Sequence, residues 1–247
     1  AGTGSPLSYC QTESVGAVQT VTDMGHVSRE KNPGTSALAG LYIILDPSVC
    51  TDRPLVDVLK LSATAGAKIV QYRNKTASMK VAYEEALQLR KVAQELGALF
   101  IINDRCDLAL AVDADGVHLG QGDVPLNLAR KVMGPDKLIG ISTHNREQVI
   151  AATAGDPDYL GFGPIFTPGS KLDHDPVVGI VGLKTIRQLT PLPIFAIGGI
   201  TLDNAEDVRQ AGANGVAVIS AVLKASDVAQ AVNDFVARLS TPAAPTS

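Results

Sequence analysis

Short apolar runs alternate with longer amphipathic segments along most of the chain. Runs such as LYIIL at 41–45 and ALFII at 98–102 have the length and composition of buried strands. The apolar runs cover residues 41–45, 67–73, 98–102, 115–119, 137–142, 158–162, 192–197 and 215–220. The amphipathic segments that follow them cover residues 54–64, 77–96, 105–112, 125–133, 145–154, 179–189, 203–211 and 226–239. Such alternation predicts parallel strands joined by right-handed helical crossovers.

Eight strand–helix repeats within roughly 200 residues fit closure into a (β/α)8 TIM barrel better than an open doubly wound sheet. Thr76, Asn145 and Asp203 stand at expected helix N-caps, and Gly97 and Gly212 stand at expected helix C-termini. The predicted fold is therefore an α/β, parallel eight-stranded TIM barrel. In this fold the active site lies at the carboxyl ends of the strands.

Residues 1–36 show neither a helical nor a strand period and are rich in small and polar residues. We expect a flexible N-terminal extension there, followed by a catalytic barrel at 37–240 and a C-terminal tail at 241–247. A transit peptide is the alternative for the extension, although Arg29 is its only arginine. The first residue is alanine, which fits a chain that was processed or cut from a longer or fused polypeptide.

Composition narrows the classes of function. Of the 247 residues, 45% are apolar, which is enough for one sizeable core. The net charge of −4 gives no indication of nucleic acid or of an anionic membrane surface as a partner. No apolar run approaches the ~18 residues of a spanning helix. The widely spaced Cys10, Cys50 and Cys106 indicate reduced thiols, and hence a cytoplasmic protein, rather than a disulfide framework or a zinc site.

Two positively charged side chains follow one another at the end of the second predicted strand. Strand alternation places Ile69, Gln71 and Arg73 on one face, so Gln71 and Arg73 line the barrel mouth if Ile69 packs inside. Together with Lys75 they suit an anionic ligand. The alternative is a solvated edge with ordinary surface charges.

Acids follow the next two strands. Asn103 and Asp104 end the third strand, and Asp123 lies in the loop after the fourth. Two carboxylates at neighbouring strand tips can share one Mg²⁺, which fills its other positions with water and phosphate oxygens. The alternative is that each aspartate caps the helix that follows it.

Three later loops complete the predicted mouth. Ser142 shares a strand face with Gly140, so its hydroxyl is expected at the mouth unless it caps a helix. The long loop after the sixth strand carries one cation, Lys171, and the alternative there is a mobile lid with a solvated lysine. After the seventh and eighth strands, Gly198-Gly199 and Ile219-Ser220 match the phosphate site of many barrels, although a tight turn without a ligand would look similar.

Three other reactive side chains are interpreted as structural. A single histidine on a barrel strand is more often a hydrogen-bonded core residue than a base, so His118 and His144 are left out of the chemistry. Cys106 has no evident activating base nearby in the sequence and is expected to pack in the core.

Taken together, these motifs resemble the thiamine-phosphate synthase family over residues 41 to about 238. The resemblance is carried by VQYRNK, IINDRCDLAL, DADGVHLGQGDVP, IGISTH, DYLGFGPIF with the following SK, FAIGGITLDNA and GANGVAVIS. It implies a transferase that joins a pyrimidine pyrophosphate to a thiazole phosphate with the help of Mg²⁺.

The resemblance also implies roles for single residues. The pyrimidine pyrophosphate site corresponds to Gln71, Tyr72, Arg73, Asn74, Lys75, Asn103, Ser142 and Lys171. Among these, Arg73, Lys75, Ser142 and Lys171 are the expected catalytic residues. The Mg²⁺ ligands correspond to Asp104 and Asp123. The thiazole phosphate site corresponds to Pro168, Ser170, Gly199, Ile219 and Ser220.

One loop departs from the family pattern. Where the family usually has Thr-x-Thr-Lys, this chain has Pro168-Gly169-Ser170-Lys171. Proline has neither a hydroxyl nor an N–H to donate, so Thr167 is a candidate substitute.

Two other functions remain open on the same fold: a thiazole tautomerase-like barrel that needs no metal, and a non-catalytic ligand sensor. A homo-oligomer is also expected.

Overall fold

The computed structural model describes residues 1–2, 38–167 and 176–240. The chain divides into units at 1–31 and 32–247, and all of the helices and strands described belong to the second unit. The predicted N-terminal extension, apart from residues 1–2, and the predicted C-terminal tail lie outside the described residues.

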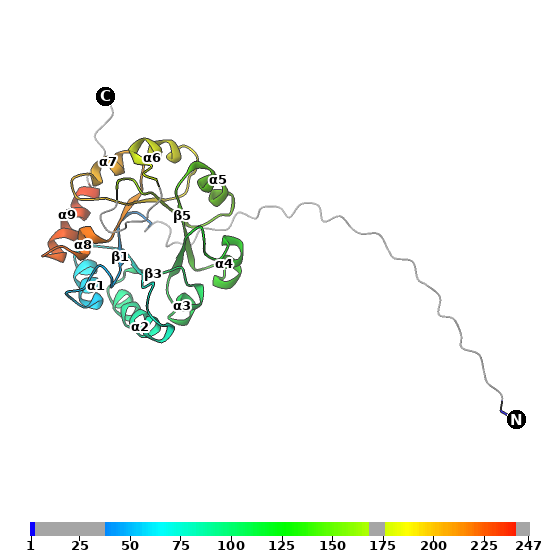
Figure 1. The fold of residues 1–247 in the computed structure, drawn as a ribbon. Helices are drawn as coiled ribbons and strands as arrows, with labels where there is room; N and C mark the ends of the chain where they lie inside the picture. Colours follow the sequence, from blue (N-terminus) through cyan, green and yellow to red (C-terminus); the bar gives the residue numbers. More distant parts are fainter. Residues whose placement is uncertain (3–37, 168–175, 241–247) are drawn as a thin grey trace. The chain divides into compact units, whose positions relative to one another are not determined.

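Eight parallel strands close into a barrel in the order of the sequence, β1-β2-β3-β4-β5-β6-β7-β8, which confirms the predicted TIM barrel. The strands are β1 (Gly40–Leu45), β2 (Ile69–Tyr72), β3 (Leu99–Asn103), β4 (Gly116–Leu119), β5 (Leu138–Thr143), β6 (Tyr159–Phe162), β7 (Ile194–Ile197) and β8 (Gly215–Val218). Figure 1 shows the helices as a ring around these strands.

The helices are α1 (Leu55–Thr64), α2 (Met79–Glu95), α3 (Cys106–Ala111), α4 (Leu126–Met133), α5 (Arg146–Ala154), α6 (Gly179–Arg187), α7 (Ala205–Gln210), α8 (Ser220–Leu223) and α9 (Val228–Ser240). The short α8 begins directly after β8, within residues that the sequence pattern assigned to the last strand. Within the described ranges, no helix is long and apolar enough to cross a membrane.

Helix ends follow local hydrogen bonding. Asn145 caps α5 as predicted, since its side chain accepts a hydrogen bond from Gln148 N. The other two predicted N-caps are wrong: Ser78 caps α2 and Asn204 precedes α7, in place of Thr76 and Asp203. The main chain of Thr76 instead donates to Asn74 Oδ1, which shifts the helix start by two residues.

Two apolar clusters hold the barrel together. The larger one lies between the sheet and the helices, and the smaller one fills the barrel interior. The interior cluster comprises Leu38, Tyr42, Ile44, Ile69, Ile101, Leu138, Tyr159, Phe195 and Ala217. These residues alternate with outward-facing ones along each strand, so the next inward positions toward the carboxyl ends form the mouth.

Candidate active site

A cavity of about 840 Å³ opens at the carboxyl ends of the strands. Ten of the residues predicted from the sequence line it: Gln71, Arg73, Lys75, Asn103, Asp104, Asp123, Ser142, Gly199, Ile219 and Ser220. Three others, Pro168, Ser170 and Lys171, lie outside the described residues. The cavity therefore gathers side chains from strand ends all around the barrel.

The two predicted metal-binding acids meet at this mouth. Asp104 follows β3 with a positive φ of 64°, and Asp123 lies in the loop after β4, where its Oδ2 accepts a hydrogen bond of 2.6 Å from Gly120 N. Burial raises the pKa of Asp123, and the neighbouring Asp104 carboxylate raises it further. Neither acid caps a helix, because α3 and α4 begin after Arg105 and Pro125.

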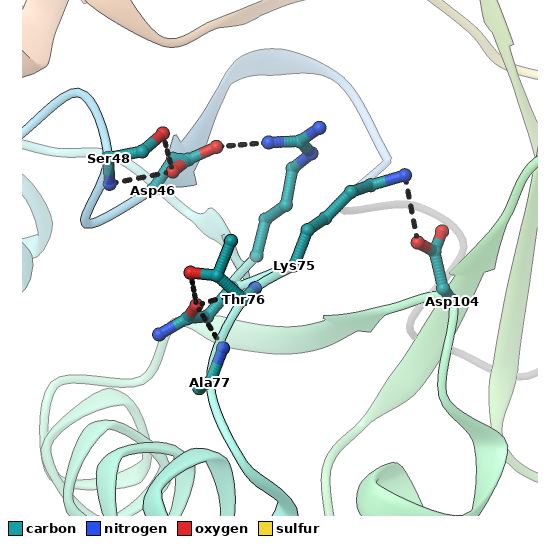
Figure 2. Close-up of polar contacts among 8 residues, drawn as sticks. Asp46, Ser48, Lys75, Thr76, Ala77 and Asp104 are labelled. Carbon is teal, nitrogen blue, oxygen red and sulfur yellow. Dashed lines mark hydrogen bonds and ion pairs between the residues drawn. The ribbon is translucent and has the colours of Figure 1, made fainter.

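Among the described residues of the mouth, the cations Lys75 and Arg73 are each paired with an acid. Lys75 Nζ lies 3.2 Å from Asp104 Oδ2, and Figure 2 shows the lysine reaching across to that carboxylate. Arg73 Nη1 donates to Asp46 Oδ2 at the end of β1. Asp46 is 3% exposed, and its Oδ1 accepts hydrogen bonds from Ser48 N at 2.9 Å and Ser48 Oγ at 2.6 Å. The buried Asp46 therefore holds Arg73 in position, whereas the Lys75 side chain is paired but 56% exposed.

Asp46 was missed by the sequence reasoning. It continues the inward-facing positions of Tyr42 and Ile44, and the period of two along the first strand could have identified it.

Tyr72 and Asn74 do not reach the cavity. The Tyr72 hydroxyl donates a hydrogen bond of 2.5 Å to Glu85 Oε2 on α2, and Asn74 Nδ2 donates to the same oxygen at 3.1 Å. Burial and the adjacent Glu85 carboxylate raise the pKa of Tyr72. Both side chains therefore fix the β2–α2 connection on the outer face of the strand.

A row of hydrogen-bonded side chains crosses the floor of the cavity. Gln71 Nε2 donates to Tyr42 Oη at 2.8 Å, and Tyr42 Oη lies 2.9 Å from Tyr159 Oη. His118 Nδ1 lies 3.1 Å from Tyr159 Oη, and His118 Nε2 lies 2.9 Å from Ser142 Oγ. Burial lowers the pKa of His118 to about 4, so the ring is neutral near pH 7.

The other residues interpreted as structural are hydrogen-bonded or packed. His144 Nδ1 lies 2.7 Å from Gly163 O, which ties the end of β5 to the loop after β6. Cys106 is 8% exposed in the outer core, and burial raises the pKa of its thiol. This environment disfavours a reactive thiolate.

The loops after β6 and β7 approach each other too closely for side chains. Gly199 has a φ of +61°, and a Cβ atom there would lie 2.7 Å from both Phe166 Cβ and Thr167 O. Gly198 O accepts a hydrogen bond of 3.0 Å from Phe166 N. Within the described residues, the N–H groups of Gly199 and Ser220 have no hydrogen-bond acceptor. They are therefore available to an anion at this side of the cavity.

The closed barrel, with a cavity of charged and polar side chains at the carboxyl ends of its strands, has the architecture of a TIM-barrel enzyme. The family model described as thiamine monophosphate synthase matches residues 41–222. The chain is 46% identical to a thiamine-phosphate synthase of Chloroflexus aurantiacus over 81% of this chain and 92% of that protein. It is 45% identical to a thiamine-phosphate synthase of Methanospirillum hungatei over 79% of this chain and 95% of that protein.

A solved structure agrees with these relatives. The barrel is similar to thiamine phosphate pyrophosphorylase from Pyrococcus furiosus, with a TM-score of 0.74, 37% identity and coverage of 82% of this chain and 96% of that one. The chain belongs to the thiamine-phosphate synthase family and is a transferase.

Proposed function

We propose that the protein condenses 4-amino-5-hydroxymethyl-2-methylpyrimidine pyrophosphate with hydroxyethylthiazole phosphate, giving thiamine phosphate and pyrophosphate. The observation that carries this proposal is the meeting of Asp104 and Asp123 beside Lys75 and Arg73 in one cavity. A pyrophosphate is polyanionic and chelates divalent ions, so it needs both cations and metal-binding carboxylates.

The donor set fits Mg²⁺. Two adjacent carboxylates offer hard oxygen ligands, and Mg²⁺ commonly takes one or two carboxylates together with phosphate oxygens and water. When bound, Mg²⁺ would neutralise charge on the pyrophosphate group. Asp104 and Asp123 would hold it there.

Arg73 and Lys75 would stabilise the negative charge of the departing group. The bond between the pyrimidine methylene carbon and the pyrophosphate oxygen breaks, and its electron pair leaves with the pyrophosphate. The thiazole nitrogen lone pair then forms a bond to that carbon and leaves the thiazole ring cationic. No proton is transferred in either step, so the neutral, hydrogen-bonded His118 is not needed as a base.

The thiazole phosphate would bind on the far side of the cavity. We place it at Gly199, Ile219 and Ser220, where main-chain N–H groups are available at the ends of β7 and β8. From the family resemblance, Lys171 and Ser170 would close the site, and Pro168 removes one hydroxyl contact.

A cytoplasmic location and a homo-oligomer stay predictions from the sequence.

The decisive assay supplies both purified substrates with and without Mg²⁺ and measures released pyrophosphate. We expect release only with both substrates and the metal. Conversion of the thiazole substrate alone would favour a tautomerase-like enzyme, and tight product binding without turnover would favour a sensor.

A variant pair tests the metal site. Asp104→Asn is expected to lower kcat about 100-fold or more, by analogy with loss of one preorganised charge-stabilising group. Asp107→Asn is the matched control, because Asp107 is an exposed acid paired with Arg105 on the outer surface. Equal rates in the two variants at saturating Mg²⁺ would refute the assignment.

A further inference from the structure

The polar row on the cavity floor joins residues from five strands. Its members are Gln71 on β2, Tyr42 on β1, Tyr159 on β6, His118 on β4 and Ser142 on β5, linked by the four hydrogen bonds of 2.8–3.1 Å given above. All five line the cavity. The family resemblance implies a role in pyrimidine pyrophosphate binding only for the two ends of this row, Gln71 and Ser142, so its three central members still need an explanation.

We infer a direction for the row from the requirement that each buried hydroxyl proton has an acceptor. Gln71 Nε2 donates to Tyr42 Oη, and the remaining hydrogen-bond partner of Tyr42 Oη among the described residues is Tyr159 Oη, which therefore accepts the Tyr42 proton. Tyr159 Oη then donates to its other partner, His118 Nδ1. A neutral imidazole whose Nδ1 accepts carries its proton on Nε2.

The two ends of the row then have opposite character. His118 Nε2–H donates to Ser142 Oγ, which leaves the Ser142 hydroxyl proton for a ligand. At the other end, Gln71 donates through its amide nitrogen and keeps its amide oxygen as an acceptor. Within the described residues, no further side-chain hydrogen bond involves Ser142 Oγ or Gln71 Oε1. The cavity floor therefore offers one fixed donor and one fixed acceptor.

We propose that Tyr42, Tyr159 and His118 are positioning residues that make the site specific for a 4-aminopyrimidine over the corresponding 4-oxopyrimidine. The inference rests on the proposed function. An aminopyrimidine edge presents an N–H donor beside a ring-nitrogen acceptor, which complements an acceptor at Gln71 and a donor at Ser142. In a 4-oxopyrimidine the same two positions are reversed, so both contacts are lost.

Close packing keeps the row from adapting. A Cβ atom at Gly140 would lie 2.1 Å from Tyr159 Cζ and 2.5 Å from His118 Nδ1, so these rings occupy the space beside a glycine. The Tyr42 and Tyr159 rings also pack edge-on against Phe195, with centroids 5.1 and 5.5 Å away. Reversal of the row would require an amide flip at Gln71, reorientation of both tyrosine hydroxyls and a tautomer change at His118 together, while the packing keeps the rings in the same positions.

The test compares kcat/KM for the amino and oxo pyrimidine pyrophosphates at saturating thiazole phosphate and Mg²⁺. We expect Tyr159→Phe to reduce the amino-over-oxo preference at least about ten-fold, since loss of one fixed hydrogen bond frees the imidazole to change tautomer. His118→Gln is expected to retain most of the preference, because its amide can accept from Tyr159 and donate to Ser142. Tyr83→Phe on the surface of α2 is the control. An unchanged preference in Tyr159→Phe would overturn the proposal.

A second measurement does not depend on activity, and its readout comes from the wild-type protein. Long-range ¹⁵N–¹H spectra of the wild-type protein distinguish a protonated from an unprotonated ring nitrogen, and His118→Gln identifies which signals belong to His118. We expect protonated Nε2 and unprotonated Nδ1 at neutral pH. The opposite tautomer, or a charged ring, would overturn the proposal. Failure of the proposed function would show separately, as no pyrophosphate release from the amino substrate.

Discussion

Asp46→Asn tests whether a buried acid holds Arg73 in the orientation that the proposed pyrophosphate site requires. The substitution keeps an oxygen for the two Ser48 hydrogen bonds but turns the partner of Arg73 from an acceptor into a donor. The side chains of Asp46 and Arg73 are only 4% and 18% exposed, so solvent screens the pair weakly.

The magnitude follows from that burial. Removing one partner of a buried ion pair costs about 3–5 kcal/mol. Because Arg73 keeps some contact with solvent and the Ser48 bonds survive, we expect a loss of about 2 kcal/mol in the free energy of unfolding. With a urea m-value of about 2 kcal/mol/M, the unfolding midpoint moves down by roughly 1 M. In kinetics, kcat/KM for the pyrimidine pyrophosphate falls about 10- to 100-fold, as for other residues that orient a ligand-binding group.

The assays are urea unfolding and steady-state kinetics in each substrate separately. Asp52→Asn is the control, because Asp52 pairs with Arg53 in the same loop but is 62% exposed, and we expect no change in its midpoint. A double-mutant cycle with Arg73→Met isolates the pair, since removing the stranded guanidinium should restore part of the lost stability. Additive effects of the two substitutions would show that the ion pair does not hold Arg73.

Three further outcomes are expected. The pKa of Asp123 is raised in the folded state, so the native protein binds more protons than the unfolded chain as pH rises from the unfolded to the folded pKa. Without Mg²⁺, wild type should therefore lose stability relative to Asp123→Asn over that rise in pH; a constant difference would contradict this. Gly140→Ala should destabilise by about 1–3 kcal/mol through its clash with Tyr159, whereas Gly122→Ala, with open space around it, should not; equal urea midpoints would count against the packing argument. Lys171→Ala should lower kcat about 100-fold in the pyrophosphate-release assay, and a wild-type rate would exclude its predicted role.

The fold could be predicted because the barrel repeats one simple unit. Each strand is a buried apolar run and each helix an amphipathic segment, so period and length alone place most elements within about two residues. Helix starts were less predictable. Asn74 accepts hydrogen bonds from Thr76 N and Ala77 N, and this turn, which the sequence pattern does not reveal, moves the cap of α2 to Ser78.

The mouth of the site was predictable for a similar reason. Gln71, Arg73, Asp104 and Ser142 come at strand ends, and barrel geometry brings all strand ends to one opening. The same period of two explains why Tyr72 does not belong there, since it alternates with Gln71 and faces the helices.

The cavity floor could not be predicted, because its order depends on contacts across the barrel. Tyr42 and Tyr159 are 117 positions apart in the sequence, and their hydroxyls meet only because both residues face inward at neighbouring depths. As single residues, Tyr42 and Tyr159 look like ordinary interior aromatics, and His118 looks like a satisfied core histidine. Each interpretation is correct for the residue alone. The hydrogen bonds between them nevertheless make the row directional, and a directional row can distinguish a donor from an acceptor on a bound ring. The same hydrogen bonds therefore give Tyr42, Tyr159 and His118 both their structural role in the barrel interior and their proposed role in substrate specificity.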